Sequence, residues 1–91
     1  MLKLEWQEEA RLDLIAIIEY ISDDNPRAAQ ELKDEIELKV SRLISRPLLY
    51  KKGRIAGTRE MLVRKNYIVV YAVQNQGVSV LRVLHTSQKW P

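Results

Sequence analysis

The residues of this 91-residue chain best suited to chemistry are its arginines and its single histidine. Arg54, Arg59 and Arg82 carry the positive charge that stabilises a phosphate during phosphodiester cleavage. His85 is of the residue type that most often serves as a general acid or base. Together the three arginines could form a cationic pocket in which His85 is the general acid or base. The alternative is that His85 is an ordinary hydrogen-bonded residue at the end of a strand, and both interpretations stay open.

The residue types that are missing or rare exclude several other classes of protein. The chain has no cysteine, which excludes disulfides, thiol catalysis and cysteine-based zinc sites. One histidine excludes a multi-histidine metal site, and no glycine lies in a phosphate-binding pattern such as GxGxxG. No apolar run approaches the ~18 residues that span a bilayer, and the acidic residues near Met1 are unlike a signal peptide. We therefore expect a cytoplasmic protein with no metal, no cofactor and no membrane partner.

The formal net charge of +3 conceals two halves of opposite sign. Residues 1–45 contain 6 Lys/Arg and 11 Asp/Glu, a net charge of −5, whereas residues 46–91 contain 9 Lys/Arg and a single acid, Glu60, a net charge of +8. A surface this basic could attract phosphate backbones or an acidic protein segment. The plainer alternative is a solvated charged face. Because acids are almost absent from the second half, we favour a functional surface.

Apolar residues at helical spacing predict two helices, over residues 8–22 and 26–45. Asn25 can cap the second helix, and Pro26 suits its first turn because that position needs no N–H donor. Since only a few residues separate the two helices, we expect an antiparallel hairpin.

Alternating apolar and polar residues, separated by turn residues, predict a sheet. Its strands are expected over residues 2–6, 58–64, 67–74 and 78–85. The strand that starts at Tyr67 is apolar on both faces and should be central. The predicted fold is one α+β domain over residues 1–91 in the order β-α-α-β-β-β. An antiparallel sheet would carry the N-terminal helical hairpin on one face.

Short motifs follow one another in a particular order along essentially the whole chain. They are Trp6, Asp13-Leu14, Asn25-Pro26, Gly53-Arg54, Gly57-Thr58-Arg59-Glu60, Tyr67-Ile68-Val69, Leu81-Arg82-Val83-Leu84-His85 and Trp90-Pro91. In this order they resemble the RelE/ParE superfamily, the toxins of bacterial type II toxin–antitoxin modules. The resemblance implies a cognate antitoxin encoded beside the toxin. It also implies that operator DNA is bound only indirectly, through that antitoxin.

The superfamily contains two activities, and fold alone does not choose between them. RelE-like toxins cut mRNA on the ribosome, whereas ParE-like toxins inhibit DNA gyrase. The nucleases carry a basic residue directly after the tyrosine of the central strand, but here Ile68 follows Tyr67. The resemblance therefore favours a ParE-like toxin that arrests growth by inhibiting gyrase and serves plasmid stabilisation. The alternatives are a metal-independent, ribosome-dependent mRNA endonuclease and a degenerate toxin that only binds antitoxin and regulates its operon.

Two binding surfaces are predicted. The target-binding surface is expected to comprise Arg59, Arg64, Lys65, Arg82, His85, Lys89 and Trp90. The antitoxin-binding surface is expected to comprise Ala16, Tyr20, Leu32, Arg54, Arg59 and Arg82. Arg59 and Arg82 could instead pair with a helix carboxylate. For Arg82 we favour the first interpretation, in which its side chain is exposed in a functional groove. Trp90 could equally pack the C-terminal residues onto the sheet.

Overall fold

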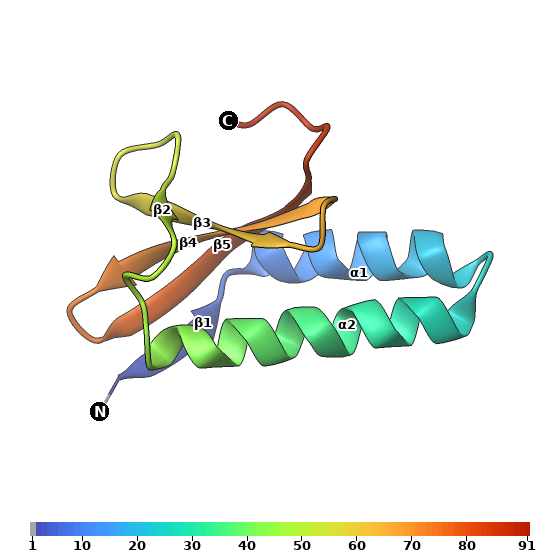
Figure 1. Ribbon diagram of the computed structural model, residues 1–91, viewed down its shortest axis with the longest axis horizontal. Coiled ribbons are helices and arrows are strands. Elements are labelled where there is room, and N and C mark those ends of the chain that lie inside the picture. The colour runs from blue at the N-terminus through green and yellow to red at the C-terminus, as the bar shows by residue number, and fades with distance from the viewer. Residues whose placement is uncertain (1) are drawn as a thin grey trace.

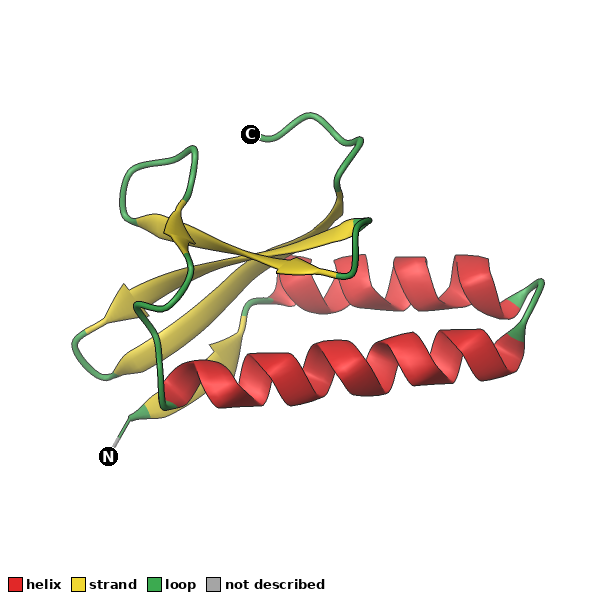
Figure 2. Cartoon of the chain, viewed as in Figure 1, coloured by secondary structure: helices red, strands yellow, loops and turns green. Residues whose placement is uncertain are grey.

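A helical hairpin covers one face of a five-stranded sheet, and the C-terminal residues lie on the other side (Figures 1 and 2). The computed structural model describes residues 2–91. Its helices are α1 (Glu8–Ser22) and α2 (Pro26–Ser41), followed by the 3-10 turn η1 (Arg42–Ile44). Its strands are β1 (Lys3–Trp6), β2 (Lys51–Lys52), β3 (Thr58–Val63), β4 (Tyr67–Gln74) and β5 (Gly77–His85). The predicted α+β class and element order are confirmed, and β2 is an additional short strand in the stretch expected to be loop.

The sheet is mixed rather than wholly antiparallel. Its strand order is β1-β5-β4-β3-β2, which places β4 at the centre as predicted. Strands β3, β4 and β5 pair antiparallel, but β1 pairs with β5 in parallel. The hairpin explains this difference, because α1 carries the chain away from β1 and α2 returns it to the side where β1 began (Figure 1). Strand β3 therefore runs in the direction of β1, and so does β5 after two further reversals.

The second helix begins with the predicted cap and ends earlier than predicted. The Asn25 side chain accepts a hydrogen bond of 3.0 Å from the N–H of Ala28, and Pro26 occupies the first position. The helix ends at Ser41 and tightens into η1, and Pro47, which disfavours helical backbone in the residue before it, follows this turn. Within residues 2–91, neither α1 nor α2 combines the length and apolarity needed to cross a membrane.

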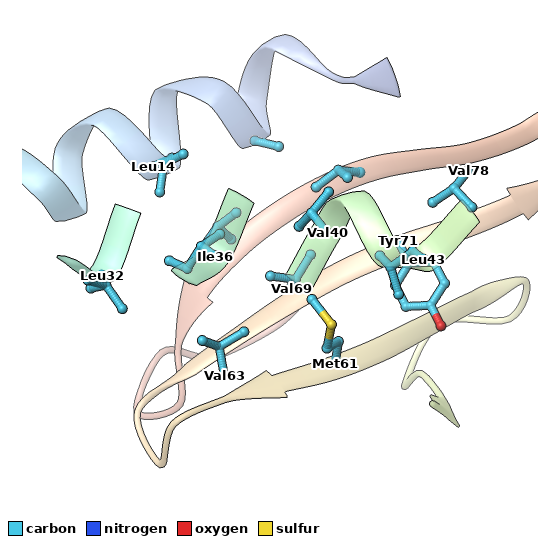
Figure 3. Close-up of a cluster of buried hydrophobic side chains, with 13 residues drawn as sticks. Leu14, Leu32, Ile36, Val40, Leu43, Met61, Val63, Val69, Tyr71 and Val78 are labelled. Atoms are coloured by element: carbon cyan, nitrogen blue, oxygen red, sulfur yellow. The ribbon is translucent and has the colours of Figure 1, made fainter. Parts of the chain in front are cut away.

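The hydrophobic core lies between the hairpin and the sheet (Figure 3). Ile36 and Val40 of α2 share this cluster with Met61 and Tyr71 of the sheet, and all four are fully buried. Leu32 belongs to the same cluster and is only 1% exposed. This burial corrects the expectation that Leu32 contributes to an antitoxin surface, since the hairpin turns its side chain toward the sheet.

Candidate functional site

The face of the sheet opposite the helices has an apolar floor. Ile68, Val70 and Leu84 form a second buried cluster there, with Leu81 and Trp90 packed against them. Ile68 is 9% exposed and occupies the position where the resemblance led us to look for a nuclease's cation. Beside it lies a hollow of about 380 Å³, lined by Leu49, Tyr50, Lys51, Glu60, Leu62 and Ile68. The centre of the open face is therefore aliphatic and largely buried.

Arg82 lies on the edge of β5 and pairs with a carboxylate of α1. Its Nε and Nη2 donate to the two oxygens of Asp13 at 2.7 and 3.0 Å, and the N–H of Val83 donates to Asp13 Oδ2 at 2.9 Å. The register of β4 and β5 shifts next to this point, between Val70 and Tyr71. The hydrogen bonds to Asp13 raise the pKa of Arg82. Of the two interpretations of Arg82, pairing with a helix carboxylate is the one that the structure contains, not an open groove.

Trp90 packs against the apolar cluster on the open face of the sheet. The C-terminal segment lies on this side of the sheet, away from the helices (Figure 1). The Arg82 guanidinium lies 5.5 Å from the centre of the Trp90 ring, a cation–π distance. The Trp90 carbonyl accepts a long hydrogen bond of 3.4 Å from Arg54 Nη1. Its indole Nε1 is buried and has no hydrogen-bond partner among residues 2–91. In this position Trp90 covers the apolar cluster of the central strands.

The single acid of the basic half, Glu60, is 3% exposed on β3. Its Oε2 accepts a hydrogen bond of 3.1 Å from the Arg54 N–H and lies 3.4 Å from Arg54 Nε. A buried carboxylate is costly unless a cation and hydrogen-bond donors surround it, and Arg54 supplies both. Glu60 thus holds the loop before β3 against the sheet.

Arg59 lies on the other face of β3, beside residues 46–50. Its Nη1 donates to the carbonyl of Tyr50 at 2.7 Å and to that of Leu48 at 3.4 Å. Within residues 2–91 Arg59 therefore binds backbone carbonyls and not the helix acid that was one of its two expected partners. Next to it, the Tyr71 hydroxyl donates to the carbonyl of Pro47 at 2.8 Å, and burial raises the pKa of Tyr71.

His85 ends β5 in a local network of hydrogen bonds. The ring Nδ1 of His85 accepts from the Ser87 backbone N–H at 3.1 Å and lies 2.7 Å from Ser87 Oγ. The backbone N–H of His85 donates to Gln88 Oε1 at 2.7 Å. The His85 ring packs edge-on against Tyr67 with ring centres 5.5 Å apart. His85 is therefore an ordinary hydrogen-bonded residue at the end of a strand. It does not lie together with Arg54 and Arg59.

The remaining predicted target-binding cations lie at the surface. Arg64 adopts a left-handed backbone with φ of 54° in the β3–β4 turn, and its Nε donates to Glu35 Oε1 of α2 at 2.9 Å. That hydrogen bond and charge hold the pKa of Glu35 below its usual value. Lys65 and Lys89 are exposed.

The predicted antitoxin residues of α1 are accessible. Ala16 is exposed, and Tyr20 is the most exposed large apolar side chain of residues 2–91. Leu12 and Ile15 are exposed on the same helix. An apolar ridge therefore runs along α1 where a partner could pack.

The four candidate catalytic residues do not share one pocket. Arg54 and Arg82 converge on Trp90, but each is paired with a carboxylate. Arg59 lies on the opposite side of β3, and His85 is in its own turn. In residues 2–91 no group of three histidine or acidic side chains is placed to hold a metal ion.

Asp13 and Glu60 are the residues whose importance the sequence reasoning missed. Asp13 entered the sequence analysis only as part of the Asp13-Leu14 motif. Glu60 offered one signal, as the single carboxylate among 46 residues of the second half, because a lone acid in a basic half has a cation nearby. The position of Asp13 beside β5 has no local signal, since its partners lie about seventy residues away along the chain.

Comparison with known proteins shows which family the sequence and fold of this chain match. Residues 4–90 match the family model described as the ParE toxin of the type II toxin–antitoxin system parDE. Y4kP of Sinorhizobium fredii is 33% identical over 90 residues, covering 98% of this chain and 93% of Y4kP. Toxin RelE2 of Caulobacter vibrioides is 30% identical over 90 residues, covering 97% of this chain and 99% of RelE2. A chain of the chromosomal ParDE system from P. aeruginosa has a TM-score of 0.83 at 22% identity, covering 93% of this chain and 96% of that one.

Proposed function

The chain belongs to the ParE toxin family of type II toxin–antitoxin systems, and we propose that it arrests bacterial growth by inhibiting DNA gyrase. As a toxin of such a system, it has an antitoxin as its partner. The observation that carries the proposal is the aliphatic floor of the open sheet face, with Ile68 at its centre. We further propose that it acts in the cytoplasm and contributes to plasmid stabilisation.

The aliphatic floor argues against RNA cleavage on physical grounds. Cleavage without a metal requires cations that stabilise the phosphorane and an acid and a base on either side of one phosphate. Here Arg54 and Arg82 are already neutralised by Glu60 and Asp13. A phosphate on Ile68 would meet hydrocarbon instead of charge. Inhibition of a protein target needs a surface and not a catalytic centre, and this chain has such a surface.

The test uses the purified chain in two assays at equal concentration. We expect the chain to inhibit supercoiling by purified DNA gyrase and to leave mRNA ends on translating ribosomes unchanged. The same chain in complex with its antitoxin should be inactive in both assays. Codon-position-specific mRNA cuts with normal supercoiling would replace the proposal with a ribosome-dependent endonuclease, the activity class of RelE-like toxins. No effect in either assay and no growth arrest would identify a degenerate toxin that acts only through its antitoxin.

Matched charge reversals test which surface contacts the target. Lys65→Glu combined with Lys89→Glu changes two exposed cations of the basic half. Lys3→Glu combined with Arg27→Glu makes the same change in net charge on the acidic half. We expect the first pair to weaken gyrase inhibition by about tenfold or more and the second by less than about twofold. Equal loss in both pairs would remove the basic half as the contact surface.

A further inference from the structure

The segment that links α2 to β3 has a concentration of unpaired positive charge. Residues 42–57 contain no acid, and the exposed cations Arg42, Arg46, Lys51 and Lys52 form no ion pair within residues 2–91. By contrast, Arg54, Arg64 and Arg82 all contact carboxylates. Four of the nine Lys/Arg side chains that have no carboxylate partner within residues 2–91 therefore lie in this one segment.

The same segment exposes large apolar side chains. Leu48 and Leu49 are 65% and 60% exposed. Between the segment and the end of α2 lies a hollow of about 370 Å³, whose lining includes Lys39, Arg42, Arg46, Leu49 and Tyr50. We call this hollow, with its apolar floor and cationic rim, the basic hollow. Exposed apolar surface beside charge is typical of an interaction site.

The backbone of this segment is held in place from the sheet. The Tyr71 hydroxyl binds the carbonyl of Pro47, and Arg59 binds the carbonyls of Leu48 and Tyr50. Strand β2 then pairs with β3 directly after Tyr50. These contacts draw the carbonyls inward while Leu48 and Leu49 stay in solvent. A surface ordered before binding loses less entropy when a partner docks.

We propose that the basic hollow binds an acidic, apolar segment of the antitoxin. Nucleic acid would use the cations but not the leucines, since phosphate contacts carry most of its affinity. A protein segment with carboxylates and apolar side chains uses both, and opposite charge speeds its association. A toxin stored in complex with its antitoxin also keeps Leu49 covered, the exposed leucine that lines this hollow. The inference rests on membership of the toxin family and holds for either target, gyrase or ribosome.

The ridge on α1 provides a matched comparison. Leu12 is 58% exposed, close to the value for Leu49, but its helix also carries Glu8, Glu9 and Glu19 on the surface. An acidic segment would be repelled there and attracted at the basic hollow. The charge around each leucine, and not its exposure, therefore distinguishes the two surfaces.

The experiment titrates the full chain with the purified antitoxin encoded beside it, by calorimetry at low and high salt. We expect Leu49→Asp to weaken binding about tenfold or more, and Leu12→Asp, on the α1 ridge with its acidic surroundings, to weaken it less than Leu49→Asp does. Arg42→Glu combined with Arg46→Glu should weaken binding further and reduce its salt dependence. Circular dichroism confirms that each variant folds. Should Leu49→Asp fail to fold, Leu49→Ser with the arginine pair makes the same test.

Three outcomes would overturn the inference. Unchanged affinity in the Leu49 and arginine variants would remove the basic hollow from the antitoxin interface. A larger loss from Leu12→Asp would move the acidic segment to α1. Arginine variants that lose binding to a 20-base-pair DNA duplex but keep their antitoxin affinity would identify a nucleic-acid surface instead. Because the readout is antitoxin binding, a negative result here is separate from a failure of the proposed gyrase inhibition.

Discussion

Replacing Asp13 with Ala should destabilise the fold well beyond the loss of an exposed ion pair. Asp13 accepts three hydrogen bonds, from Arg82 Nε, Arg82 Nη2 and the Val83 N–H, at 2.7, 3.0 and 2.9 Å. The side chains of Arg82 and Asp13 are 28% and 18% exposed. The substitution leaves one cation and one strand N–H without their partner, which costs more than the loss of an exposed ion pair.

The expected magnitude lies between two limits. Exposed ion pairs contribute about 0–1 kcal/mol, and removing one partner of a buried pair costs about 3–5 kcal/mol. For this half-buried pair we expect Asp13→Ala to lower the free energy of unfolding by about 2–3 kcal/mol. In a domain of this size the midpoint of thermal unfolding should fall by about 10–20 °C.

Urea unfolding of Asp13→Ala, Arg82→Met and the double variant forms a double-mutant cycle. We expect a coupling free energy of at least about 1 kcal/mol between the two positions. Arg27→Ala is the control, because its pair with Glu31 spans 3.5 Å and the Arg27 side chain is 92% exposed. It should change stability by less than about 0.5 kcal/mol. If Asp13→Ala were as stable as the control, or the cycle additive, the structural role of this pair would be refuted.

Three further predictions follow from other contacts. Gly77 has φ of +146°, and a Cβ there would overlap the backbone of Lys3. Gly77→Ala should therefore release β1 from β5 and lower the unfolding free energy by about 3 kcal/mol or more. Rapid hydrogen exchange in β1 would verify this prediction, and protected amides would contradict it. Deleting residues 89–91 removes Trp90 from the open face and should raise binding of an apolar dye; unchanged fluorescence would show that Trp90 does not cover the cluster. Arg64 lowers the pKa of Glu35 below 4.5, so the stability this pair contributes is present above that pH and is lost as the pH falls below it. Both side chains are about one-third or more exposed, so the effect is small. Glu35→Gln should reduce the difference in unfolding free energy between pH 7 and pH 3, measured with urea, by less than about 1 kcal/mol. An unaltered pH profile would disprove the assignment.

The helices and the central strand could be predicted from local patterns. The Asn25-Pro26 cap depends on residues that are neighbours in sequence, so its signal is complete within a few positions. The run from Tyr67 to Val73 is apolar on both faces, and that alone requires a central place in a sheet. The parallel pairing of β1 required the path of the hairpin, which alternation of residues does not encode.

The partners of the cations could not be predicted, because they are set by tertiary placement. Arg82 and Asp13 are 69 residues apart along the chain and meet only because α1 runs beside β5. Arg59 binds carbonyl oxygens, and a carbonyl leaves no signal in residue types. Leu32 lies in the apolar stripe of α2, and the sequence does not show which flank of that stripe the sheet covers. Charge composition thus predicted a basic half correctly but did not separate its structural cations from its free ones.

Supercoiling of relaxed plasmid by purified DNA gyrase, with increasing amounts of this chain, tests the central claim most directly. The account predicts loss of supercoiling as toxin is added and full recovery when antitoxin is added in equal amount. Undiminished supercoiling at a toxin excess, together with new mRNA ends on ribosomes treated with the same preparation, would contradict it. That result would mean that a face floored by Ile68, Val70 and Leu84 can support RNA cleavage after all.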